Sequence, residues 1–165
     1  MQNHTRDVPS LGQESVWDYP RPPKIELSGK RILVIFGGRV VADSTRAFKC
    51  MERSHPPTYY IPAEDIGPEY LTDSDRVSVC EYKGGARYFD VHVGDMVAQD
   101  AAWHYPTPKA PYGALAGHVA FYAQKMDECS VDGEMVQPQP GTFYGGWITS
   151  DIAGPFKGAS GTLGW

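Results

Sequence analysis

Short stretches of alternating apolar and polar residues run through this chain, with the period of two that is typical of strands that bury one face. Between Arg76 and Tyr82, for example, Val77 and Val79 alternate with polar neighbours. β-Branched and aromatic residues, which favour strands, are concentrated in Thr58-Tyr59-Tyr60-Ile61. The pattern predicts strands or hairpins at residues 31–42, 58–61, 76–82, 86–93, 118–122 and 129–136.

Three hairpins are predicted from one repeated arrangement: an apolar approach, a glycine near a charged residue, and an apolar return that ends in valine. The copies are Phe36 to Val41, Val93 to Val97 and Val131 to Val136. Glycine readily reaches the positive φ angles that tight hairpin turns need. We expect the three ribbons to join in one sheet.

Helices are expected to be few and short. Residues 43–52 fit a strand, and a short helix capped by Asp43 or Ser44 is the alternative. A helical turn is predicted around residues 63–66, and a short helix at 111–116. Glycine (18) and proline (14) are abundant in the 165 residues, which suits many short strands joined by turns. The sequence therefore predicts a mainly β protein with one or two short helices and a single compact domain.

Composition divides the chain into three segments. Residues 1–23 are polar and end in a proline-rich stretch, so we expect an extended N-terminal arm. Residues 24–137 hold the predicted strands of the β domain. Residues 138–165 are rich in glycine but also carry aromatic residues, which flexible linkers lack. We predict that this C-terminal tail packs on the domain or on a partner subunit.

Charge and hydropathy narrow the partners and the compartment. The net charge of −5 argues against nucleic acid, because binding to phosphates needs clustered Lys and Arg. The longest apolar run, Ile32 to Phe36, is far shorter than the roughly 20 residues that cross a bilayer, so no membrane partner is expected. The start of the chain lacks an apolar signal segment, and three widely spaced cysteines suit free thiols. We therefore expect a cytoplasmic protein.

Four segments resemble the signatures of domain-of-unknown-function family 427, in the order that the family has them. They are Ser54 to Tyr60, Tyr82 to Tyr88, Ala101 to Pro106 and Gly117 to Tyr122. The closing segments, Gly145 to Ile152 and Gly154 to Gly158, resemble the longer members of the family. The resemblance spans about residues 30–137 and implies a compact β fold, similar to the β-tent class, in a family with no established activity.

Two departures limit what the resemblance implies. Family members often have Cys-Pro-Tyr where this chain has Cys80-Glu81-Tyr82. Other members of the β-tent class bind zinc through paired Cys-x-x-Cys motifs, which this sequence lacks. The five histidines also lack the spacing of a metal site. We expect neither a metal nor a cofactor.

A candidate ligand site lies around Lys83-Gly84-Gly85-Ala86-Arg87, where two cations flank glycines whose backbone N–H groups can form an anion-binding nest. A tight turn with solvated charges is the alternative. Aromatic residues are dense between Tyr82 and Tyr122, and they form either ordinary core or the wall of a ligand cleft. We predict a small, anionic and partly aromatic ligand that contacts Lys83, Arg87, Tyr59, Trp103, Tyr105 and Tyr122.

Acid–base catalysis without a metal would depend on Glu81, His55 or His118. The alternatives are a solvated ion pair between Glu81 and Lys83, and a packed, hydrogen-bonded histidine in the stiff loop at His55. Cys80 is a candidate nucleophile if one of these histidines lies near it, and a small buried side chain otherwise. The sequence lacks a Gly-x-Ser-x-Gly elbow and a dinucleotide fingerprint, so it leaves open whether the protein is an enzyme.

A second hypothesis is a non-enzymatic interaction module that forms a homodimer through its arm and tail. Trp17, Trp147 and Trp165 would then lie at a subunit contact. The ligand hypothesis instead requires Lys83, Arg87 and at least two of the named aromatic residues to meet in one cavity.

Overall fold

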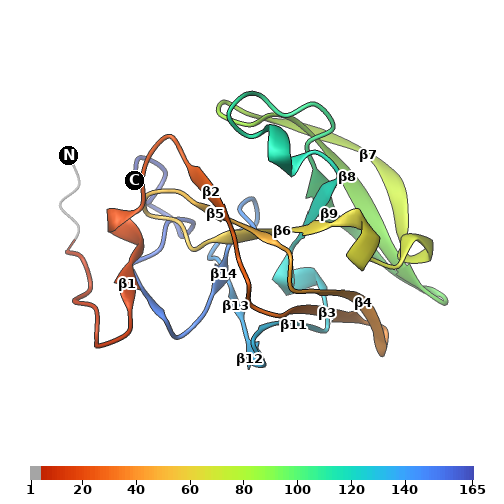
Figure 1. Cartoon of the computed structure of the whole chain (residues 1–165), viewed down its shortest axis with the longest axis horizontal. Coiled ribbons are helices and arrows are strands. Elements are labelled where there is room, and N and C mark those ends of the chain that lie inside the picture. The colour runs from red at the N-terminus through yellow and green to blue at the C-terminus, as the bar shows by residue number, and fades with distance from the viewer. Residues whose placement is uncertain (1–4) are drawn as a thin grey trace.

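Two antiparallel sheets form most of the protein (Figure 1). The structure is a computed structural model, and it describes residues 5–165. The seven-stranded sheet consists, in spatial order, of β2 (Lys24–Leu27), β5 (Phe48–Met51), β6 (Thr58–Pro62), β10 (His118–Phe121), β9 (Met96–His104), β8 (Gly84–Val93) and β7 (Leu71–Cys80). The four-stranded sheet consists of β12 (Glu134–Met135), β11 (Glu128–Val131), β3 (Ile32–Phe36) and β4 (Arg39–Ser44). The prediction of a mainly β domain is confirmed.

Two short strand pairs and five single helical turns complete the described chain. The pairs are β1 (Glu14–Ser15) with β15 (Ile152–Ala153), and β13 (Gln137–Pro138) with β14 (Trp147–Ile148). The 3-10 turns are η1 (Val16–Asp18), η2 (Ala63–Asp65), η3 (Pro68–Tyr70), η4 (Gly113–Leu115) and η5 (Ala123–Lys125). Residues 43–52, for which a short helix was the alternative, are the end of β4 and the strand β5.

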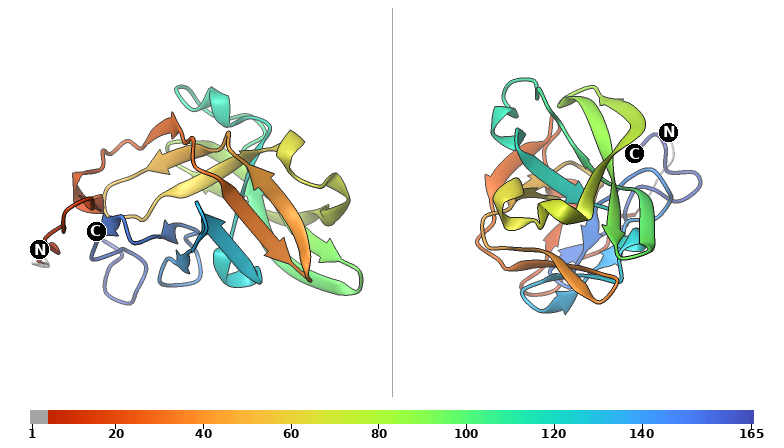
Figure 2. Two further views of the ribbon diagram at one scale, coloured as in Figure 1. Left: turned by 60° about the horizontal axis from the view of Figure 1, so that its bottom comes forward. Right: turned by 90° about the vertical axis from the view of Figure 1, so that its right-hand side faces the viewer.

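The three predicted hairpins are present, but they do not share one sheet. Gly37, Gly94 and Gly133 take φ angles of 58°, 57° and 82° at the three tips, as tight turns require. The hairpins β3-β4 and β11-β12 belong to the four-stranded sheet, whereas β8-β9 belongs to the seven-stranded one (Figure 2). The expectation of one sheet is wrong because β11 pairs with the free edge of β3. This pairing joins the first and third hairpins in one sheet and leaves the second hairpin in the other.

Successive residues of the seven-stranded sheet pack on opposite faces, and this alternation creates two separate clusters. Tyr59 and Phe121 belong to the main core, together with Val34 of the four-stranded sheet. Their sequence neighbours Tyr60 and Tyr122 belong to a second, aromatic cluster on the other face. The sheet thus separates an ordinary hydrophobic core from a layer that is rich in phenols.

The tail packs on the β domain of the same chain through Trp147. Its side chain is 1% exposed, it belongs to the main core, and its indole N–H donates to the carbonyl of Phe121 at 3.0 Å. The arm is held as well, because the indole of Trp17 is buried and donates to the carbonyl of Pro155 in the tail. Two of the three tryptophans expected at a subunit contact are therefore already buried within one chain.

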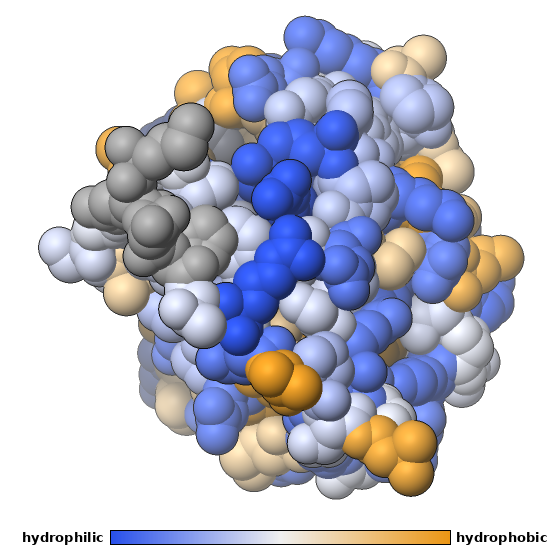
Figure 3. Space-filling model, turned by 90° about the vertical axis from the view of Figure 1, so that its left-hand side faces the viewer, coloured by the Kyte–Doolittle hydropathy of each residue, from blue (hydrophilic) through white to orange (hydrophobic). Residues whose placement is uncertain are grey.

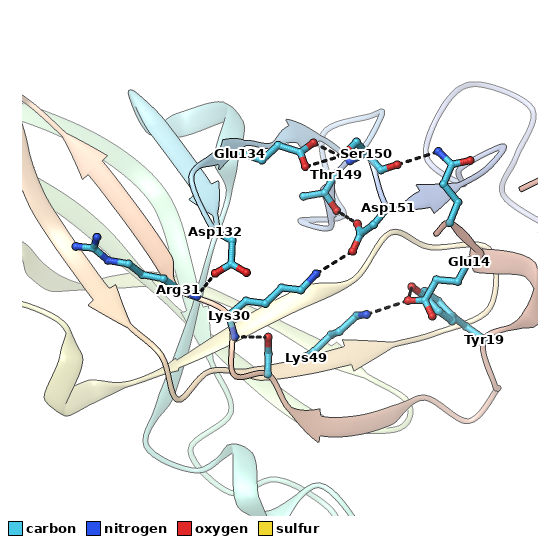
Figure 4. A network of polar contacts seen from close by, with 12 residues as sticks. Glu14, Tyr19, Lys30, Arg31, Lys49, Asp132, Glu134, Thr149, Ser150 and Asp151 are labelled. Carbon is cyan, nitrogen blue, oxygen red and sulfur yellow. Dashed lines mark hydrogen bonds and ion pairs between the residues drawn. The ribbon is translucent and has the colours of Figure 1, made fainter. Parts of the chain in front are cut away.

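Polar contacts fasten the arm and the tail to the edge of the domain (Figure 4). Lys30 contacts Asp151 at 2.9 Å, and Lys49 contacts Glu14 at 3.0 Å. The carboxylate of Glu134 accepts hydrogen bonds from the backbone and the hydroxyl of Ser150. The C-terminus lies on this side, which Figure 3 shows as mainly hydrophilic with separate apolar residues.

Candidate functional site

A cavity of about 330 Å³ lies on the aromatic face of the seven-stranded sheet, within the usual size range of small-molecule sites. Strands β5 to β9 supply its floor, the turn that follows β7 supplies one rim, and the tail supplies the opposite wall. Arg21 of the arm also reaches it. Segments that are far apart in the sequence thus meet around one space.

Aromatic rings form the floor of this cavity. The ring centroids of Trp103 and Tyr122 lie 4.6 Å apart. The ring centroid of Tyr60 lies 6.3 Å from that of Trp103 and 6.1 Å from that of Tyr105. Burial raises the pKa of the phenols of Tyr60, Tyr105 and Tyr122. These phenols keep their protons at neutral pH, so they act as hydrogen-bond donors rather than as anions. The hydroxyl of Tyr122 donates to the carbonyl of Phe143 at 2.8 Å.

Lys83 places a cation at the cavity rim. Its side chain is almost fully buried, and its Nζ lies 4.0 Å from Sγ of Cys80 and 5.9 Å from the ring centre of Tyr105. The backbone carbonyl of Lys83 accepts a hydrogen bond from the N–H of Lys109, which fixes the turn. Among residues 5–165, no carboxylate oxygen lies within 4.0 Å of this ammonium group.

The neighbours of Lys83 keep it charged. Burial by itself lowers the pKa of the ammonium, but the groups around it, with Tyr60 first and then Cys50, Cys80 and Glu52, raise it above its usual value. Tyr60 and Cys50 hold their own protons because burial raises their pKa, so they face the ammonium as dipoles at neutral pH. Glu52 is the one carboxylate among these four neighbours.

The tail closes the cavity through close contacts that only glycine permits. A Cβ atom on Gly145 would lie 2.3 Å from the ring of Trp103, and one on Gly146 would lie 2.5 Å from the carbonyl oxygen of Pro56. Farther along the tail, Lys157 lines the cavity and its Nζ lies 5.4 Å from the ring centre of Tyr144. The small residues let the tail approach the floor, and Lys157 adds a second cation.

The comparison with known families concerns the middle of the chain. Residues 24–132 match the family described as a domain of unknown function, DUF427. The chain belongs to the DUF427 family. A search of curated proteins finds no match. The match covers the floor and Lys83, whereas Arg21 and the tail wall lie outside the DUF427 region.

His55 of the DUF427 region lines the cavity, but both of its ring nitrogens have protein partners. Oε1 of Gln139 accepts from the N–H of Gly146 at 3.0 Å, so the amide nitrogen must face His55 Nδ1 at 3.0 Å and donate to it. Nε2 then carries the proton and lies 3.4 Å from the carboxylate of Glu52. This arrangement makes His55 a fixed part of the wall, with no ring nitrogen free to exchange a proton with a ligand.

Glu52 balances the charges at the arm side of the cavity. Its carboxylate lies 3.3 Å from the guanidinium of Arg21, which also donates to the carbonyls of Arg53 and Trp165. Burial raises the pKa of Glu52, but the hydrogen bond from His55 and the nearby cations outweigh it, so the pKa lies below its usual value. Arg21 and Glu52 neutralise each other, which leaves Lys83 and Lys157 as the cations without a carboxylate partner among the described lining residues.

Six of the nine predicted site residues line the cavity. They are Lys83, Trp103, Tyr105, Tyr122, Glu81 and His55. Glu81 is exposed at the rim. Three predicted residues do not line the cavity, and the side-chain alternation of the strands explains two of them. Tyr59 lies on the opposite face from Tyr60, and Arg87 is exposed on the opposite face from Tyr88. The expectation that Lys83 and Arg87 share one cavity is therefore wrong.

His118 also lies outside the cavity. It begins β10 four residues before Tyr122, a separation of about 13 Å along an extended strand. Its ring packs on Phe48 at 5.1 Å, and Nδ1 lies 3.0 Å from the carbonyl of Ala116. The prediction of a Cys80 nucleophile required a nearby histidine as its base. Neither His55 nor His118 provides that base.

Sequence reasoning missed Tyr60, Glu52 and Gln139. Strand alternation could have found Tyr60, because β6 pairs with β10 and its alternate residues share the aromatic face. No sequence signal marks Glu52 or Gln139, which reach the cavity through a loop and the tail. Within residues 5–165 no group of three or more His, Cys, Asp or Glu side chains could hold a metal ion, and no helix is long and apolar enough to cross a membrane.

Proposed function

We propose that this protein binds a small, anionic and partly aromatic ligand in the cavity between the sheet and the tail. The observation that carries the proposal is Lys83. This residue is 7% exposed and lines the cavity, and no carboxylate among residues 5–165 lies within 4.0 Å of its ammonium group. A buried charge is costly unless an opposite charge compensates it. An anionic ligand would supply that charge.

The floor supports the rest of the proposed ligand. Trp103 and Tyr122 offer ring faces for stacking, and the protonated phenols of Tyr60 and Tyr105 can donate hydrogen bonds to an oxyanion. Lys157 of the tail would provide a second positive charge from the opposite wall. A ligand with a carboxylate or phosphate at one end and a flat ring at the other fits this distribution of groups.

Glu81 is the predicted acid–base residue that we retain in this proposal. It lines the cavity and is exposed to solvent, whereas His55 is held on both nitrogens and His118 lies elsewhere. We also propose that the protein acts in the cytoplasm, because its three cysteines are free thiols, which suit a reducing compartment. Two of the three anchors expected for the homodimer, Trp17 and Trp147, are buried within the chain, so we favour the ligand hypothesis over the homodimer.

A thermal-shift screen against a library of small carboxylates and phosphate esters tests the proposal. A ligand at 100 times its dissociation constant stabilises the native state by about 2.7 kcal/mol, which corresponds to roughly 5–10 °C for a chain of this size. We expect that shift in the wild type and in Lys24→Met, which removes an exposed lysine. In Lys83→Met the shift should disappear.

The melting temperature without ligand is not the readout, because replacing a buried cation by an apolar side chain can raise or lower it. A ligand shift of unchanged size in Lys83→Met would overturn the proposal. So would a library in which uncharged ring compounds stabilise the wild type as strongly as their carboxylate analogues.

A further inference from the structure

Cys80 differs from the other two cysteines in its surroundings. It ends β7, its side chain is partly exposed, and it lines the cavity. Its Sγ accepts a hydrogen bond from the backbone N–H of Lys83 at 3.4 Å and lies 4.0 Å from Nζ of the same residue. One residue of the turn thus directs both a backbone donor and a positive charge at this sulfur.

Cys50 and Cys129 differ from Cys80 in solvent access, and Cys129 also differs in position. Both are buried, and burial raises the pKa of both thiols, to about 12 for Cys129. Cys129 lies in the main core, away from the cavity. The thiolate is the reactive form of cysteine, and a nearby cation together with solvent access favours its reaction. The chain therefore contains two internal controls for the reactivity of Cys80.

We propose that Cys80 is a nucleophilic thiol that is modified covalently by small electrophiles carrying a carboxylate. This inference rests on the proposed function, because Lys83 would hold the carboxylate while the neighbouring sulfur reacts. The second observation behind it is the buried Lys83 ammonium itself, which lines the same cavity and has no carboxylate within 4.0 Å among residues 5–165.

The bonds and charges of such a modification balance without a further reactant. With iodoacetate as the probe, the thiol proton passes to the buffer and a sulfur electron pair forms the new C–S bond to the CH2 carbon. The C–I bond breaks, and iodide leaves with its electron pair. The product is a carboxymethyl thioether whose carboxylate lies close to Lys83.

The test compares iodoacetate with its neutral analogue iodoacetamide. The full-length protein is treated at neutral pH, and mass spectrometry of peptides follows the alkylation of each cysteine. Glutathione in the same buffer gives the intrinsic ratio of the two rates. We expect Cys80 to react at least tenfold faster than Cys50 and Cys129, and its iodoacetate-to-iodoacetamide ratio to exceed that of glutathione about tenfold, the lower end of electrostatic steering.

Variants at Lys83 assign the effect to its charge. Lys83→Met should bring the normalised ratio down to that of glutathione, and Lys83→Arg should keep most of it. Should Lys83→Met fail to fold, the comparison of the wild-type ratio with that of glutathione still tests the inference. A wild-type ratio equal to that of glutathione, or alkylation of Cys80 no faster than that of the buried cysteines, would overturn the inference.

Cys80→Ser separates this inference from the proposed function. The variant removes the reactive sulfur and leaves Lys83 and the aromatic floor in place. If the ligand shift of the thermal screen persists in Cys80→Ser while wild-type Cys80 shows no selective alkylation, the binding proposal stands and the nucleophile is refuted. Selective alkylation of Cys80 by iodoacetate without a ligand shift in the thermal screen would support the nucleophile and refute the binding proposal.

Discussion

Gln139 links the tail to the cavity, and its replacement by leucine tests whether the tail wall is fixed by hydrogen bonds. The side chain is 3% exposed. Its amide nitrogen donates to His55 Nδ1 at 3.0 Å and to the carbonyl of Lys157 at 2.8 Å, and its oxygen accepts from the N–H of Gly146 at 3.0 Å. Gln139→Leu keeps a similar volume but removes all three hydrogen bonds.

The expected cost follows from the groups that are left without a partner. A buried donor or acceptor that loses its hydrogen bond costs about 1–3 kcal/mol, and the contact to Lys157 is only partly buried. We therefore expect the free energy of unfolding to fall by roughly 3–5 kcal/mol. For a chain of this length, this corresponds to a loss of about 10 °C in melting temperature.

Urea denaturation followed by tryptophan fluorescence measures this change, and the matched control is Gln137→Leu. Gln137 lies on the adjacent strand β13, and its side chain is exposed, so the same substitution should change stability by less than about 0.5 kcal/mol. Amide hydrogen exchange should also increase in residues 140–146 of the Gln139→Leu variant. A loss of less than about 1 kcal/mol would refute the reasoning, because the three groups would then have found water or other partners.

Three further predictions concern the packing of the tail and the loss of stability at acid pH. Trp147→Ala should cost about 3–5 kcal/mol in urea denaturation, because this fully buried indole fills part of the main core. Gly158→Ala should cost about 3 kcal/mol or more in the same assay, since φ is +137° and the new Cβ would lie 1.8 Å from a backbone oxygen. The lowered pKa of Glu52 means that its carboxylate stabilises the fold above the ordinary pKa of about 4.3, and that this contribution is lost as pH falls through the folded value. When stability is measured by urea denaturation at a series of acid pH values, the Glu52→Gln variant should therefore lose less stability than the wild type as pH falls from 5 to 3.

Each of these predictions has a contrary outcome. Phe143→Ala is the control for Trp147, because its side chain is 52% exposed and should cost little. Gly164→Ala is the control for Gly158, because a Cβ there meets no atom within 4 Å. Equal losses within either pair would contradict the packing that we describe. An acid limb of identical slope in Glu52→Gln and wild type would show that the carboxylate has no net stabilising partners in the folded state.

The strands, the hairpin tips and most residues of the aromatic floor could be predicted from the amino-acid sequence. These features are local, because a period of two fixes which residues share a face and a glycine at a turn fixes a hairpin. Lys83 could be named because it flanks two glycines, and Trp103, Tyr105 and Tyr122 could be named because aromatic residues are dense in that part of the chain. The alternation was not applied at Tyr59 and Arg87, which is why both were assigned to the wrong face of their strands.

Long-range contacts in the folded chain fix which hairpins share a sheet and how the cavity is closed. The partner of β3 is β11, almost a hundred residues later, and no local pattern selects that pairing over others. The tail wall depends on Gly145 and Gly146 passing within contact of Trp103 and Pro56, and on Gln139 reaching His55. Such contacts join segments that are far apart in the sequence, so they depend on the long-range pairing of strands and not on any local pattern of residues.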